Sequence, residues 1–555
     1  MVTQSSGARV NVFTNDPTAK GLHLEQVPLP TGKSPFAIPG WTGAGGLFEP
    51  GSVEFEAGQL FVVLTQTYAA WAELFGEDFA WKSGAAELPI FPRAGVELQA
   101  YYDQTSLRFQ YGTDPKTNQT VYTCESSDIV AHECGHAVLD AHQPDYWHAV
   151  FPETGAFHES FGDMSALLVT LGDPAVRAAM HAETRGDLTK SNVATRFGEQ
   201  LARAGYDTGH AADVVAPNAL RDAVNSFKYR VPEKLPATAP FSKLSSGSHN
   251  FSRVFTGAFY DLLVGMYIQL REANITLSAD AALAQARLDA GHLLAQAVEI
   301  APKGEVPFSV HAASMITADA QNFGGKYFKL LRQAFVGRKI MSASAARQLK
   351  AAAGAPHIQT SSLLGTASAS IGIPTSIDPG SVRLGDDLPS GFRKAASIPK
   401  QELHLVEHRT QRDASHVLHY ATTRNVELKG KAMGAAGGAI VDLTDSVAVK
   451  VGRDGQVVSS HYHKSDQAHE KRIRDHVEKI VASGRVYEAR EGETIDPAKL
   501  IEKKQPYYIG YDSKGHKRIR RAFISCGDGY MIRGYDLDEK ALSPQGRQRK
   551  EQFRI

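Results

Sequence analysis

The chain has 555 residues, of which 42% are hydrophobic and 22% charged, and its 60 basic residues equal its 60 acidic ones in number. This composition is typical of an ordinary globular protein, and the length predicts two to four domains. A balanced charge gives no global argument for nucleic acid or an anionic membrane as partner, so neither is predicted. The three cysteines, Cys124, Cys134 and Cys526, are too few for a disulfide framework, and we expect buried thiols, with a Cys124–Cys134 pair as the alternative.

Residues 1–30 lack the basic start and apolar run of a secretory signal, and no run of about eighteen apolar residues predicts a membrane span. We therefore expect a protein that is cytoplasmic or exported by a route that reads no signal peptide. The oligomeric state stays open.

The first part of the chain changes character near residue 46. Residues 1–45 are polar and then rich in proline and glycine, which predicts a flexible tail. Residues 60–76 carry an aromatic stripe at helical spacing that ends at Gly76. Residues 96–123 alternate between apolar and polar side chains, which predicts antiparallel strands. An exposed edge strand there could pair with an extended peptide.

The most informative stretch is H-E-x-x-H at His132, Glu133 and His136. Two histidines four positions apart lie on one helix face, where one Zn²⁺ can bind a nitrogen of each. Glu133 reaches the same cleft and can accept a proton from a zinc-bound water without being a ligand. The alternative, two surface histidines on an ordinary helix, is less favoured because acidic residues suited to a zinc site lie a short way downstream.

A catalytic zinc needs a third protein ligand, and a second predicted helix after Thr154 offers one. Glu159 is the candidate ligand. Asp163, one turn later, can accept the second N–H of a zinc-bound histidine. A solvated acidic face is the alternative for this pair, and His142 and His158 are rival ligands that rank lower.

The rest of the chain divides into three parts. Residues 154–345 read as mainly helical, residues 350–400 are rich in alanine, serine, glycine and proline and predict a linker, and residues 402–530 read as a separate α+β unit. A second metal site is disfavoured because no acidic or thiol partner stands at ligand spacing from the histidines considered, which are His461, His463 and His469.

The order of these motifs resembles the thermolysin family of zinc peptidases over roughly residues 50–345. The matching stretches are H-E-x-x-H at 132–136, G-A-x-x-E-x-x-x-D at 155–163, A-L-R at 219–221, S-H-N-F-S at 248–252 followed by A-F-Y at 258–260, and Q-A-Y-Y at 99–102. The resemblance implies that Arg221 binds a substrate carbonyl, that His249 stabilises the transition state, and that Ala100 lies in the strand that holds the substrate. It also implies cleavage before a bulky apolar residue.

The chain departs from that family in three places. Leu244 or a neighbour stands where an aspartate would support the transition-state histidine, and the loop before Glu159 is slightly longer than usual. Thr170 and Leu171 stand where acidic calcium ligands are expected. Calcium is therefore not predicted.

We therefore predict an α+β, thermolysin-like catalytic domain of two lobes, β-rich and helical, with the zinc helix between them and a separate C-terminal α+β domain. The expected boundaries are 1–45 tail, 46–150 β-rich lobe, 151–348 helical lobe, 349–401 linker and 402–555 C-terminal domain. The expected activity is endopeptidase hydrolysis of a peptide or protein with one zinc per chain. The alternative is a catalytically weak or inactive zinc-binding protein that serves as a binding or toxin-delivery module.

Overall fold

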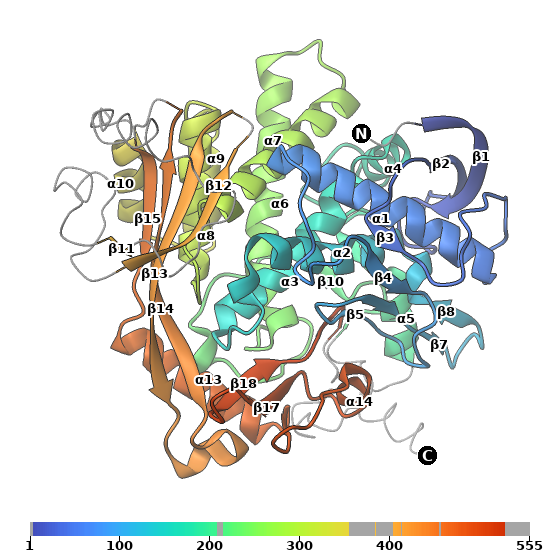
Figure 1. The fold of residues 1–555 in the computed structure, drawn as a ribbon. Helices are drawn as coiled ribbons and strands as arrows, with labels where there is room; N and C mark the ends of the chain where they lie inside the picture. Colours follow the sequence, from blue (N-terminus) through green and yellow to red (C-terminus); the bar gives the residue numbers. More distant parts are fainter. Residues whose placement is uncertain are drawn as a thin grey trace.

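The computed structural model describes residues 4–207, 215–353, 383–384, 403–411, 413–453 and 457–527. It is a mixed α+β fold with a sheet-rich C-terminal region (Figure 1). The two helices that carry the H-E-x-x-H and G-A-x-x-E stretches lie near the middle of the molecule, between the N-terminal strands and the C-terminal sheet.

The N-terminal residues form structure rather than the predicted tail. Strands β1 (Gln4–Phe13) and β2 (Leu24–Pro30) pair as an antiparallel hairpin. Val10, Val12 and Leu29 are buried with Val62 of helix α1 in one apolar cluster. The prediction of a flexible segment is therefore wrong for these residues, because alternating apolar side chains at an edge can tolerate the prolines that suggested a loop.

Helix α1 (Val53–Phe75) starts earlier than predicted and ends as predicted, at Gly76 in the left-handed conformation (φ 81°). Strands from before and after α1 form a five-stranded sheet of order β19-β5-β6-β4-β3, and β7 and β8 form a separate hairpin. These strands are β3 (Phe36–Ala37), β4 (Leu88–Phe91), β5 (Ala100–Tyr102), β6 (Leu107–Phe109), β7 (Tyr111–Thr113), β8 (Thr120–Tyr122) and β19 (Ile524–Ser525). The predicted antiparallel strands are confirmed for β5–β6 and β7–β8.

A helical region follows, as the sequence predicts. Its central helices are α2 (Ser127–His142), α3 (Pro152–Thr170) and α6 (Ser248–Ala273). The others are α4 (Pro174–Thr184), α5 (Glu199–Asp207), α7 (Ala279–Glu299), α8 (Phe308–Asn322), α9 (Phe328–Gly337) and α10 (Ala343–Ala353), and the short strands β9 (Arg196–Phe197) and β10 (Arg221–Asp222) pair with each other. One large apolar core joins these helices to the N-terminal sheet.

The C-terminal region is built on an eight-stranded sheet. Its strands are β11 (Arg383–Leu384), β12 (Leu403–Thr410), β13 (His416–Glu427), β14 (Ile440–Val451), β15 (Val457–His463), β16 (Val486–Glu488), β17 (Tyr507–Tyr511) and β18 (Lys517–Arg521), with helices α13 (Gln467–Ala482) and α14 (Pro497–Glu502). Most of the predicted linker lies outside the described residues, although α10 extends helical structure to Ala353.

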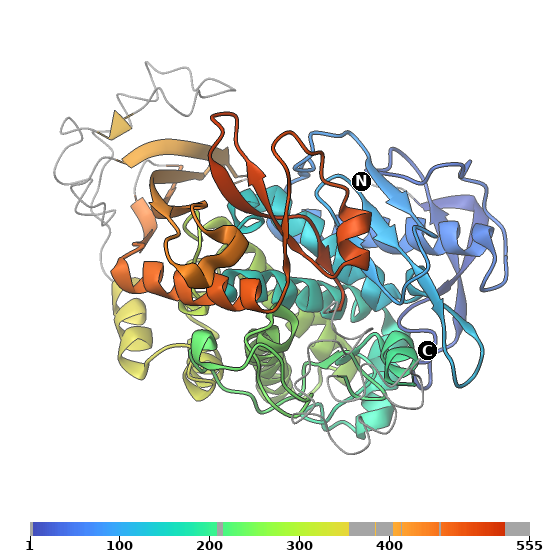
Figure 2. The same ribbon diagram turned by 90° about the horizontal axis from the view of Figure 1, so that it is seen from below.

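The C-terminal region is not wholly separate from the helical region. Val150 and Phe151, which precede α3, are buried in the apolar cluster of the C-terminal sheet and α13. After β18 the chain leaves its own sheet, and β19 joins the N-terminal sheet beside β5. Seen from below, the last strands, drawn red, lie beside the blue N-terminal strands (Figure 2).

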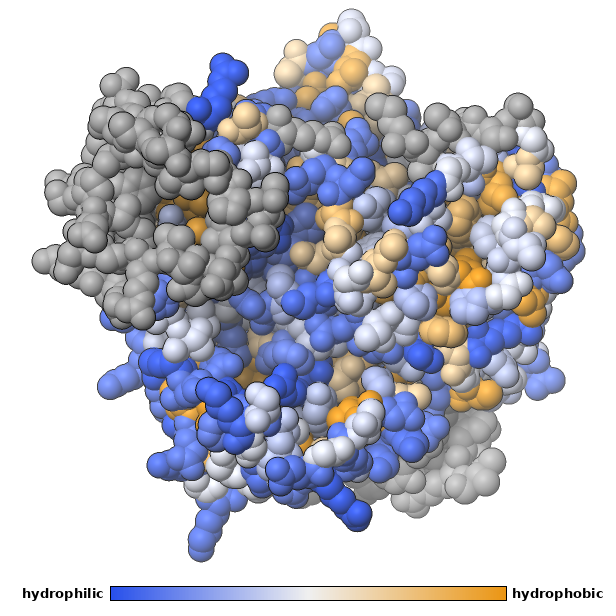
Figure 3. Space-filling view, viewed as in Figure 1, coloured by the Kyte–Doolittle hydropathy of each residue, from blue (hydrophilic) through white to orange (hydrophobic). Residues whose placement is uncertain are grey.

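On the face seen in Figure 3 hydrophilic side chains predominate, and apolar side chains form small separated patches. Within the described part of the chain, none of the helices combines the length and the apolar character needed to cross a lipid bilayer.

Candidate metal centre

Helix α2 places the two histidines of H-E-x-x-H side by side at its buried face. The rings of His132 and His136 have centroids 4.6 Å apart. Their Nε2 atoms are buried and find no hydrogen-bond partner among the described residues, and the same holds for both carboxylate oxygens of Glu133. Buried polar atoms are almost always paired, so a cluster of unpaired ones is unusual. A metal site requires nitrogen and oxygen atoms that are available as ligands, and this cluster supplies them.

Two glycines bring helix α3 close enough to α2 to contribute a third ligand. A Cβ on Gly135 would lie 2.5 Å from Ser165 Oγ, and one on Gly162 would lie 2.6 Å from ring atoms of His132. Any larger residue at these positions would push the helices or the imidazole apart. The close crossing therefore fixes the distance between the α2 histidines and Glu159 on α3.

The distances fit a metal ion held by three side chains. Glu159 Oε2 lies 3.6 Å from His132 Nε2 and 4.0 Å from His136 Nε2. Ligand atoms about 2.0–2.1 Å from a tetrahedral zinc are separated by about 3.3 Å, so small side-chain shifts complete this geometry. Glu133 also lies within 4.8 Å of the two histidine nitrogens, and His132, Glu133 and His136 form the only such group among the described residues.

Asp163 contacts the Nδ1 atom of His132, as its position one helical turn after Glu159 predicts. Its Oδ1 lies 3.2 Å from His132 Nδ1. Arg221 Nε donates to both carboxylate oxygens of Asp163 at 2.9 and 3.0 Å, and Thr256 Oγ1 donates to Oδ2 at 3.3 Å. Burial alone would raise the pKa of Asp163, but Arg221 and His132 lower it below the ordinary value, so the carboxylate stays charged.

The sequence did not identify the corresponding partner of His136. His158, considered there as a rival ligand, lies with its Nδ1 3.0 Å from His136 Nδ1. That contact engages Nδ1 of His136 and leaves its Nε2 for the site, and a metal on Nε2 would make the Nδ1–H of His136 the donor to His158. The other rival, His142, stacks on Phe75 with ring centroids 3.6 Å apart and contacts Arg409, so it takes no part in the cluster.

Burial shapes the protonation of the cluster. It raises the pKa of Glu133 to about 8, with the carboxylate of Glu159 adding to the shift. Burial would lower the pKa of His132, but the nearby carboxylates of Asp163 and Glu159 outweigh it and raise the value to about 9. Burial and nearby cations lower the pKa of His136. A bound cation would favour neutral imidazoles and charged carboxylates, which are the ligating forms.

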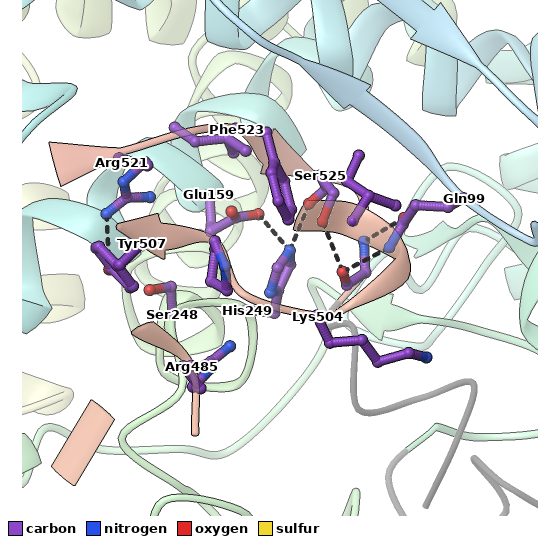
Figure 4. A pocket seen from close by; sticks show the side chains of 14 residues that line it. Gln99, Glu159, Ser248, His249, Arg485, Lys504, Tyr507, Arg521, Phe523 and Ser525 are labelled. Carbon is purple, nitrogen blue, oxygen red and sulfur yellow. Dashed lines mark hydrogen bonds and ion pairs between the residues drawn. The ribbon is translucent and has the colours of Figure 1, made fainter. Parts of the chain in front are cut away.

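His249 reaches the same cleft from helix α6. Its Nε2 lies 3.1 Å from Glu159 Oε2 and 2.5 Å from the carbonyl oxygen of Ser525 (Figure 4). Because a carbonyl only accepts, Nε2 carries the proton in this contact. The pocket drawn in Figure 4 extends from Glu159 and His249 to Tyr507 and Arg521 of the C-terminal sheet.

The main chain of Cys526, the residue after β19, contacts Ala100 and Arg221, the two residues expected to hold substrate. Ala100 O accepts from Cys526 N at 3.0 Å, and Arg221 Nη1 donates to Cys526 O at 2.7 Å. No pattern in the sequence predicts that the C-terminal segment returns to β5. The residues in contact are far apart in the chain: Gln99 Nε2 donates to Gly527 O across 428 positions.

Other predicted positions lie apart from this centre. Leu244 packs in the apolar core, and the Thr170 hydroxyl donates to Ala166 O. The three cysteines are buried thiols without a disulfide, as expected. His461, His463 and His469 are all buried in the C-terminal region, and the rings of His463 and His469 have centroids 5.3 Å apart.

No protein-family model matches the chain, and no curated protein matches it significantly. Function is therefore inferred from the geometry and chemistry of the site.

Proposed function

We propose that the protein is a zinc-dependent endopeptidase that uses His132, His136 and Glu159 as zinc ligands. The observation that supports this most is the group of buried, unpaired nitrogen and oxygen atoms on α2, which faces Glu159 on α3 where glycines let the two helices approach closely. A zinc ion bound there would act as a Lewis acid and lower the pKa of water towards neutrality. The motif order resembling the thermolysin family supports the same interpretation, including a β-rich and a helical lobe on either side of α2.

The remaining residues have separate roles in the proposed reaction. Glu133, with no hydrogen-bond partner among the described residues, would accept the proton of the attacking water and pass it to the leaving amine. His249 would donate its Nε2–H to the developing oxyanion, a contact worth about 2.7–4 kcal/mol in comparable sites. Arg221, positioned by Asp163, would hold the next carbonyl along the substrate.

Strand β5 would bind the substrate backbone. In the described sheet β5 lies between β6 and the short β19, so a substrate would pair with β5 in the position that β19 occupies here. An extended peptide that replaces β19 can pair with β5 through main-chain hydrogen bonds, which gives binding with little dependence on sequence. By resemblance, the preferred cut precedes a bulky apolar residue.

The substitution Glu133→Gln tests this proposal. The variant should keep zinc and lose casein hydrolysis by at least about 100-fold, because the general base is removed while the ligands remain. Glu299→Gln is a matched control, since Glu299 is also buried but lies on α7 with Gln296 and Gln411 as partners. Undiminished activity of Glu133→Gln would remove the mechanism. Turnover that a phosphoramidon-type inhibitor blocks in the wild type would exclude the inactive zinc-binding alternative.

A further inference from the structure

The segment 524–527 lies in the cleft as an extended peptide. Ile524 pairs with Tyr102 and Ser525 with Tyr101 in the antiparallel register of β19 and β5. The side chain of Gln99 then clamps Gly527, because its Nε2 donates to Gly527 O at 3.0 Å and its Oε1 accepts from Gly527 N at 3.2 Å. Main-chain pairing and the Gln99 side chain thus hold the segment along β5.

One peptide bond of this segment is presented to the candidate catalytic groups. The His249 Nε2 that lies 2.5 Å from Ser525 O is also 3.1 Å from Glu159 Oε2, so the Ser525 carbonyl faces the ligand cluster. The following carbonyl, of Cys526, points to Arg221 instead. The Cys526 N–H between them donates to Ala100 O.

Contacts made by the residues just before this segment fix its position in the cleft. Trp147 Nε1 donates to Arg521 O at 3.3 Å, and Ala522 N donates to Pro506 O at 2.9 Å. Ile524 is 2% exposed and belongs to the main apolar core. The segment is therefore tethered at a fixed place, and its effective concentration at the cleft is far above that of any dissolved peptide.

We propose that the Ser525–Cys526 peptide bond is a self-cleavage site of this protein, hydrolysed in cis by its own cleft; this rests on the proposed function. Water adds to the carbonyl carbon of Ser525, and Glu133 accepts a proton from it. The C–N bond to Cys526 breaks, and that proton goes to the departing nitrogen. One water is consumed, and the products are a chain ending in the Ser525 carboxylate and a peptide, 526–555, with a new amino terminus.

The test uses the full-length chain, purified without metal and then loaded with zinc. Intact-mass spectrometry should show fragments 1–525 and 526–555 forming with a first-order rate that does not change over about 100-fold dilution. Glu133→Gln should stay uncut. Cys526→Pro should also stay uncut, because proline has no N–H to donate to Ala100 O. Cys526→Val keeps that N–H and should be cut.

A second readout is independent of catalysis. In the uncut Glu133→Gln chain, iodoacetamide should label Cys526 slowly, because β19 buries it. Adding Ile524→Asp places a charge in the apolar core, should release β19 and should speed the labelling at least about tenfold. Equal rates of Cys526 labelling in both chains would contradict the burial of the segment in the cleft.

The outcomes separate this inference from the proposed function. If the wild type or Ile524→Asp hydrolyses an added peptide while the 525–526 bond of the wild type stays intact, self-cleavage is refuted and the peptidase remains. If no variant hydrolyses either the added peptide or the chain itself, the proposed peptidase function fails and self-cleavage fails with it. Cleavage at another bond would also refute the assignment of Ser525–Cys526.

Discussion

Replacing Asp163 by asparagine tests whether it supports a zinc ligand rather than binding zinc itself. Asparagine keeps the volume and one oxygen for His132 Nδ1, but it removes the charge that faces His132 at 3.2 Å and Arg221 at 2.8 Å. Losing such a partner of a ligand weakens metal binding by about 10–100-fold, or about 1.4–2.8 kcal/mol. Because Arg221 is 3% exposed and loses its counter-ion, unfolding should also become about 3 kcal/mol easier.

Competition with a chromophoric zinc chelator measures the affinity, and circular dichroism during denaturation measures the stability. Glu159→Gln should lose much more zinc affinity than Asp163→Asn, because it removes a ligand. Asp140→Asn is the control. Asp140 is a buried carboxylate on the zinc helix, but it accepts from Tyr102 and Gln104, so zinc affinity should not change. Equal zinc loss in Asp163→Asn and Glu159→Gln would refute the division into ligand and support.

Two further predictions concern the helix crossing and the C-terminal sheet. Gly162→Ala should displace the His132 ring and lower zinc affinity at least about tenfold by chelator competition, whereas Gly337→Ala, with open space around its Cβ, should not. An unchanged affinity in Gly162→Ala would contradict the tight crossing. Glu407→Gln should destabilise the fold by about 3 kcal/mol in urea denaturation, because buried Lys303 loses the carboxylate 2.6 Å away. Burial would raise the pKa of Glu407, but His419, Lys303 and Arg409 lower it below the ordinary value. The charged carboxylate therefore stabilises the fold above the pKa of an unfolded glutamate, about 4.3, and this stabilisation is lost as the pH falls below that value. A difference between wild type and Glu407→Gln that does not shrink below pH 4 would contradict this sign.

Local patterns in the sequence predicted the parts of the site that lie on single helices. The four-residue spacing of His132 and His136, and of Glu159 and Asp163, fixed which side chains share a face on α2 and on α3. The helix ends followed from glycine and proline, as at Gly76. These features need no knowledge of the rest of the chain.

Features that depend on distant contacts escaped prediction. The role of His158 as partner of His136 requires the angle at which α2 and α3 cross, and Gly135 and Gly162 gave no signal of that crossing in the sequence. The return of β19 to β5 joins ends of the chain that no local pattern relates. The hairpin at 4–30 was missed because its prolines outweighed the alternation at Val10 and Val12.

Anomalous diffraction at the zinc edge, from crystals of the zinc-loaded Glu133→Gln variant, would locate the metal directly. We expect one strong peak per chain, about 2.0–2.1 Å from His132 Nε2, His136 Nε2 and a carboxylate oxygen of Glu159. The glutamine at position 133 should lie outside bonding distance. A chain without a peak at these three residues, or a peak coordinated by position 133 in place of Glu159, would contradict this expectation.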